Sequence, residues 1–139
     1  MLSPDKLVVM AAPGEASEFF DFYRTALSLS QRSVDLIVKA FKNMFNNGPD
    51  YFSAPKFASG VECTGLIIHD ELDNETSAEH SKRVHAQWKN STLHLTKGLG
   101  HNLKSVEVVK EVIRFVEVPE FSGVNVASDI PVKFDSEIV

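Results

Sequence analysis

The chain has 139 residues, of which 43% are hydrophobic and 24% charged, so it is long enough for one compact domain and too short for two ordinary ones. Its formal charge of −5 comes from interspersed acids and bases without a Lys/Arg run, which argues against nucleic acid and anionic membrane as partners, and no apolar run approaches the roughly 18 residues of a membrane span. The single cysteine, Cys63, cannot form an internal disulfide, and no signal-like segment opens the chain, so we expect a reducing, cytoplasmic setting.

The chain begins with a pattern typical of a buried strand followed by a helix. Residues 7–12 are continuously apolar and are stopped by Pro13 and Gly14, as expected of a strand buried on both faces in a parallel sheet. A helix is predicted over residues 17–29, because apolar residues recur there at spacings of three and four. These residues are Phe19, Phe20, Tyr23, Ala26 and Leu27.

A second helix is predicted over residues 34–45, where an apolar stripe has helical period. Asn46 to Pro49 ends it, since Asn and Gly accept the left-handed geometry of a helix C-terminus and Pro cannot continue a helix. Residues 50–62 contain Pro55, Gly60 and scattered aromatic residues, and we interpret them as an irregular connection.

Two further strands and a helix are predicted in the second half. Residues 65–69 form a buried apolar run, and residues 91–96 alternate polar with apolar side chains. Between them, Thr76 and Glu79 have the spacing of a capping box, which predicts a helix over residues 77–90.

The last predicted helix covers residues 105–116 and carries one apolar face. Strands that alternate with helices indicate an α/β fold with about three parallel strands, flanking helices and right-handed crossovers. Residues 119–139 break this alternation and are expected to be an extension or tail. The apolar face of the helix consists of Val106, Val109, Ile113 and Val116.

Polar residues with catalytic potential follow the second and third predicted strands. His69 and Asp73 come after the second strand, and a glycine-framed turn with His101 follows the third. Residues at the carboxyl ends of neighbouring parallel strands share one edge of the sheet, so an acid and an imidazole can meet there. These segments resemble the C-terminal third of the α/β-hydrolase family, in which one strand ends in His-Gly-x-x-Asp and the next in Gly-x-Gly-His.

The resemblance implies a partial α/β-hydrolase fold over residues 1–118, with residues 14–60 as a helical cap inserted between the first two strands. It implies that Asp73 orients His101, and that His101 exchanges a proton with a serine hydroxyl during hydrolysis of an ester or similar acyl substrate. No cofactor or metal is implied. The chain departs from the family pattern at Asp70, where Gly is usual, and at Ser77, where Pro is frequent.

The chain contains no Gly-x-Ser-x-Gly, the motif that positions the serine nucleophile. We therefore expect an ester hydrolase that is incomplete and inactive alone. The alternative is a non-catalytic, truncated remnant that acts as a binding or assembly module. In the family, another strand pairs with the first strand seen here, so we also expect a second copy or a partner chain to cover that edge.

Alternatives exist for several residues. Asp70 is the second choice for the acid, and His69 is expected to shape the loop behind Asp73. A metal site is not expected, because His80 and His85 are five residues apart and miss the spacing that places two imidazoles on one helical face. Cys63 precedes a strand and lacks the turn of a nucleophile. The cap phenylalanines, which could pack a core or line an acyl pocket, are Phe19, Phe20, Phe41 and Phe45.

Overall fold

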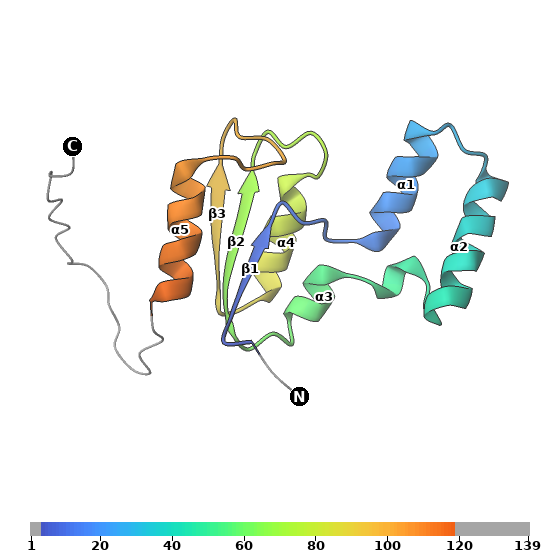
Figure 1. The fold of residues 1–139 in the computed structure, drawn as a ribbon. Coiled ribbons are helices and arrows are strands. Elements are labelled where there is room, and N and C mark those ends of the chain that lie inside the picture. Colours follow the sequence, from blue (N-terminus) through green and yellow to red (C-terminus); the bar gives the residue numbers. More distant parts are fainter. Residues whose placement is uncertain (1–3, 119–139) are drawn as a thin grey trace, which may run out of the picture.

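A computed structural model describes residues 4–118 and contains one sheet of three parallel strands in the order β1-β2-β3 (Figure 1). The strands are β1 (Lys6–Met10), β2 (Thr64–Asp70) and β3 (Ser91–Thr96). The predicted α/β class with three parallel strands is confirmed. The central strand β2 is buried along almost its whole length, because β1 and β3 flank it and helices cover both of its faces.

The two faces of the sheet are covered by different helices. On one face, Leu66 and Ile68 of β2 pack with Val108 of α5 (Val106–Glu117). On the other face, Ile67 packs with α3 (Ala54–Ala58) and with residues of α4 (Ala78–Gln87) and its C-terminal end. Successive side chains of a strand point to opposite faces, so neighbouring residues of β2 serve two separate cores.

Trp88 fixes the distance between the sheet and the end of α4. Its ring is 2% exposed, and its Nε1–H donates to the carbonyl of Cys63 at 3.0 Å. A Cβ added at Gly65 would lie 2.3 Å from this ring. Gly65 is therefore the residue of β2 that gives the indole its space.

The helices α1 (Ala16–Ala26) and α2 (Gln31–Phe45) form a hairpin that stands beside the sheet (Figure 1). Asn46 ends α2 in the left-handed conformation, with φ 57°, as the sequence predicts. Phe41 lies at the centre of an aromatic cluster, with ring centroids 4.6–5.5 Å from three neighbouring rings. These three rings belong to Phe20, Phe45 and Phe52. The phenylalanines of the hairpin therefore pack against one another, which is one of the two uses expected for them.

The interpretation of residues 50–62 as irregular was wrong. A 3₁₀ turn, η1, spans Pro49–Tyr51, and the short helix α3 follows. Ser53 caps α3 by accepting a hydrogen bond from the Lys56 N–H, and Pro55 occupies its first turn. Pro is tolerated there because the first N–H groups of a helix have no partner within the helix.

The predicted capping box of Thr76 and Glu79 does not form. Ser77 is the N-cap of α4, and its hydroxyl accepts from the Glu79 N–H at 3.3 Å. The Glu79 carboxylate binds Lys82 instead. The backbone N–H of Thr76, whose hydrogen bond Glu79 would accept in a capping box, donates to Asp73 Oδ1.

Apolar side chains remain exposed along one flank of the molecule. β1 has no strand on its outer side within residues 4–118; its Met10 is exposed on the α5 face of the sheet, and Leu7 is exposed on the opposite face. The predicted apolar face of α5 points to solvent, while the sheet is contacted by Val108 and its neighbours on the helix. The four apolar residues of this face, which are 48–63% exposed, are Val106, Val109, Ile113 and Val116.

No helix in the described part of the chain is both long and apolar enough to cross a membrane. The predicted tail, residues 119–139, lies outside the described residues.

Candidate functional site

The candidate site lies where β2 and β3 end, at the edge of the sheet from which their following loops leave (Figure 1). Asp70 ends β2 opposite Thr96, which ends β3. The turn after β3 depends on glycine, because Gly98 and Gly100 have positive φ values of 88° and 64°. This turn brings His101 back toward the loop that follows β2.

The structure brings Asp73 and His101 into contact. His101 Nδ1 lies 2.9 Å from Asp73 Oδ2, and the Asp73 side chain is fully buried. Asp73 Oδ1 accepts hydrogen bonds from the backbone N–H groups of Glu75, at 2.8 Å, and Thr76, at 3.0 Å. Burial alone would raise the pKa of the Asp73 carboxyl, but the hydrogen bonds from Thr76, His101 and Glu75 outweigh burial and lower this pKa. Asp73 is therefore a fixed carboxylate at neutral pH.

His101 has one ring nitrogen bound and one open. Nδ1 faces the carboxylate and donates to it, whereas Nε2 has no hydrogen-bond partner within residues 4–118. Within this part of the chain, every fully buried side-chain nitrogen or oxygen has a hydrogen-bond partner. Since Nε2 has none, it is not fully buried and is open to solvent. The hydrogen bond to Asp73 raises the pKa of His101, burial acts against the rise, and the charges of Asp73 and Glu75 add to it.

Asp70, the second choice for the acid, does not contact His101. Its two oxygens accept four hydrogen bonds, three from backbone N–H groups and one from the Thr96 hydroxyl. Burial would raise the pKa of Asp70, but these bonds, the one from Leu99 first, lower it to about 2. Asp70 thus ties the turn after β3 to the end of β2. The three N–H donors belong to Leu72, Gly98 and Leu99.

His69 lies behind Asp73 and is fully buried. Its Nδ1 lies 2.6 Å from the Ser81 hydroxyl, and its Nε2 lies 2.8 Å from the Thr76 carbonyl and 3.2 Å from Asp73 Oδ2. The structure therefore places His69 where the sequence expected it, packed behind the acid. Sequence reasoning missed Ser81, which has no motif and is recognisable only from its position on the buried side of α4.

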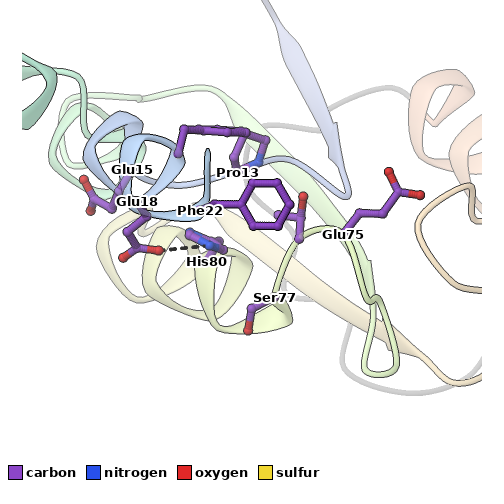
Figure 2. A pocket seen from close by; sticks show the side chains of 9 residues that line it. Pro13, Glu15, Glu18, Phe22, Glu75, Ser77 and His80 are labelled. Atoms are coloured by element: carbon purple, nitrogen blue, oxygen red, sulfur yellow. Dashed lines mark ion pairs between the residues drawn. The ribbon is translucent and has the colours of Figure 1, made fainter. Parts of the chain in front are cut away.

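A cavity of about 170 Å³ adjoins the loop that holds Asp73 (Figure 2). Glu18 and Phe22 of α1 face Ser77 and His80 across it, and Glu18 Oε2 lies 3.1 Å from His80 Nε2. Glu75 also lines it. The cavity is smaller than the roughly 300 Å³ at which small-molecule sites usually begin, so its size alone does not define a ligand.

The remaining histidines lie in separate places. His80 accepts a hydrogen bond from the Gly14 N–H, His85 binds Ser91, and His94 binds Glu111. Within residues 4–118, no group of three or more His, Cys, Asp or Glu side chains is placed to hold a metal ion. Cys63 is partly buried and its thiol is free. Its backbone carbonyl accepts the hydrogen bond from Trp88 Nε1.

No family model matches the chain, and no curated protein matches it either. Any functional assignment therefore depends on the residues and the geometry. Chemically, a buried carboxylate bound to Nδ1 holds an imidazole in the tautomer whose Nε2 can accept a proton. The acid–histidine pair, Asp73 and His101, has the arrangement of a general base and its orienting acid.

Proposed function

We propose that this chain is the acid–histidine part of an α/β-hydrolase that acts on carboxylic esters or similar acyl compounds. The observation that carries the proposal is the 2.9 Å contact between Asp73 Oδ2 and His101 Nδ1, with Nε2 open at the edge where the strands end. In this function Nε2 takes the proton of a nucleophilic hydroxyl and returns it to the leaving group. Asp73 stabilises the imidazolium that forms in between.

The proposed reaction needs a nucleophile, and the 139 residues contain no serine in the motif that usually positions one. No Gly-x-Ser-x-Gly occurs in the sequence. Ser81 is unsuitable, because it is 2% exposed and its hydroxyl is bound to His69. We infer that the chain alone is inactive and that a polypeptide segment with a serine nucleophile completes the site.

The exposed flank supports a position for that segment. The outer edge of β1 can accept one further strand, and an open groove of about 310 Å³ runs from Met10 to Val109 and Ile113 of α5. A strand beside β1, connected to a helix on α5, would cover the edge and the groove together. The partner is therefore proposed to be a strand–helix unit, or a second copy of the chain at the same edge. A reducing, cytoplasmic setting accords with the unpaired Cys63.

A second candidate is a non-catalytic module that acts in assembly. The observation that favours it is the apolar flank itself, since exposed apolar residues of α5 and β1 suit protein association whether or not a nucleophile is present. In this case the acid–histidine pair would be an inherited feature without turnover.

An ester-hydrolysis assay on the chain alone tests the requirement for an external nucleophile. The purified chain and its His101→Ala variant should hydrolyse p-nitrophenyl acetate at equal background rates, with His94→Ala as a control for the general reactivity of exposed imidazoles. A rate that is lost only in His101→Ala would contradict the requirement for an external nucleophile.

The positive test adds the nucleophile. If the coding DNA upstream of Met1 encodes Gly-x-Ser-x-Gly in frame, the extended protein should hydrolyse esters, and His101→Ala should lower its kcat/KM by at least about 10³-fold. Turnover by the extended protein that is insensitive to His101 would reject the proposed role of the pair. The non-catalytic module would then be the better explanation.

A further inference from the structure

Two imidazole rings converge on one carboxylate oxygen. Asp73 Oδ2 lies 2.9 Å from His101 Nδ1 and 3.2 Å from His69 Nε2. The other oxygen, Oδ1, is held by two backbone N–H groups, so the carboxylate cannot rotate away without losing these bonds. A proton donor on His69 therefore acts on the same oxygen that binds His101.

The hydrogen bonds of His69 determine which nitrogen carries its proton. The Thr76 carbonyl, 2.8 Å from Nε2, can only accept, so Nε2 carries a hydrogen and is the donor. Nδ1 faces the Ser81 hydroxyl, which has no other hydrogen-bond partner in the described part of the chain. A neutral ring that accepts from Ser81 at Nδ1 and donates from Nε2 satisfies every group. His69 thus donates from Nε2 to the Thr76 carbonyl, and this N–H group lies 3.2 Å from Asp73 Oδ2.

We propose that His69 is a positioning residue that limits the basicity of His101 through its Nε2–H, which is hydrogen-bonded to the Thr76 carbonyl and lies 3.2 Å from Asp73 Oδ2. The positive end of this N–H dipole offsets part of the carboxylate's negative charge and weakens its attraction for a neighbouring imidazolium. Ser81 holds the donor in place through Nδ1. The chain of contacts runs from α4 through Ser81, His69 and Asp73 to His101.

The consequence concerns the pH at which His101 can act as a base, and this part rests on the proposed function. A general base is most effective when its pKa lies near the working pH. Asp73 and Glu75 are the two acidic groups that favour the charged form of His101, and both stabilise the imidazolium. The nearby Nε2–H of His69 offsets part of this effect, so more of His101 stays neutral near pH 7.

NMR titration of His101 tests the proposal on the chain as it is. Replacement His69→Leu removes the donor and should raise the pKa of His101 by about half a unit or more. Replacement His69→Gln is the matched control, because its side-chain N–H₂ can reach the place of Nε2, and it should leave the pKa of His101 near the wild-type value. An unchanged or lowered pKa in folded His69→Leu would overturn the proposal.

A measurement on the wild-type chain covers the case in which His69→Leu does not fold. Two-bond ¹H–¹⁵N correlations should show His69 with its proton on Nε2 and a bare Nδ1, and the Nε2–H shift should change with the titration of His101. A proton on Nδ1 alone, or no response to that titration, would overturn the proposal. Neither readout involves ester turnover, so failure of the hydrolase proposal and failure of this one remain distinguishable.

Discussion

The edge where β2 and β3 end differs from the flank formed by β1 and the outer face of α5. At the strand-end edge, buried polar groups are satisfied, as the four hydrogen bonds to Asp70 illustrate. On the flank, apolar side chains such as Val109 and Ile113 lie about half exposed. In the first region the buried polar groups find their partners within residues 4–118, whereas the second exposes apolar side chains.

This difference is the reason for placing the proposed partner on the flank and not at the strand-end edge. A site held by its own hydrogen bonds can form without a partner, because each buried donor and acceptor already has its match. An apolar helix face and a free strand edge gain stability only when something covers them. The acid–histidine contact and the exposed apolar surface are therefore properties of different parts of the molecule.

The largest expected effect is on the free energy of unfolding, when the same substitution, Ile→Ala, is made at a buried position and at an exposed one. Ile67→Ala empties a site that is fully buried in β2 and should lower the free energy of unfolding by about 2–5 kcal/mol. Ile113→Ala, on the flank, should cost about 0.5 kcal/mol or less in the isolated chain. Denaturant titration of both variants measures this contrast, and equal losses would show that the flank is already covered.

The second prediction concerns acid stability at the strand-end edge. The pKa of Asp70 is about 2 in the folded chain, below the roughly 3.9 of an unfolded aspartate, so its contribution to stability is present above about pH 4 and is lost as pH falls toward 2. Asp70→Asn should lower stability at pH 7 and flatten the acid side of the stability profile. Denaturant midpoints from pH 7 to pH 2 test this, with Asp50→Asn as an exposed control. A profile of the same shape in both variants would contradict it.

The third prediction places a charge on the flank. If a partner or second copy covers the flank, the wild-type chain should self-associate at high concentration, and Ile113→Lys should shift it toward monomer. Leu36→Lys, on an exposed apolar position of α2, should leave the association unchanged. Light scattering after size-exclusion chromatography gives the masses. A stable wild-type monomer at all concentrations would remove the support for a second copy.

Much of the fold follows from local sequence patterns. Strand β2 and helix α2 were predictable because a buried apolar run and a helical stripe with an Asn C-terminus are strong signals. The helix α3 was not, because Pro55 signals a break unless the cap formed by Ser53 is known. The exposure of the apolar face of α5 could not be predicted either. Helical periodicity shows that residues share a face, but it does not show whether that face packs against the sheet.

The candidate site was predictable in its main pair and not in its supporting groups. Strand ends followed by Asp73 and His101 pointed to one edge of the sheet, and the two side chains do meet. The role of Asp70 depends on N–H groups from two loops, and that of Ser81 depends on the position of α4. Contacts between segments far apart in sequence leave no local pattern.

One measurement tests the central claim, the pairing of His101 with a buried, charged Asp73, most directly. The pKa of His101 should lie above the ordinary value of 6.5 in the wild-type chain and should fall toward that value in Asp73→Asn, as followed by NMR titration of the imidazole carbons. The same His101 pKa in both proteins, with the fold intact, would contradict the account.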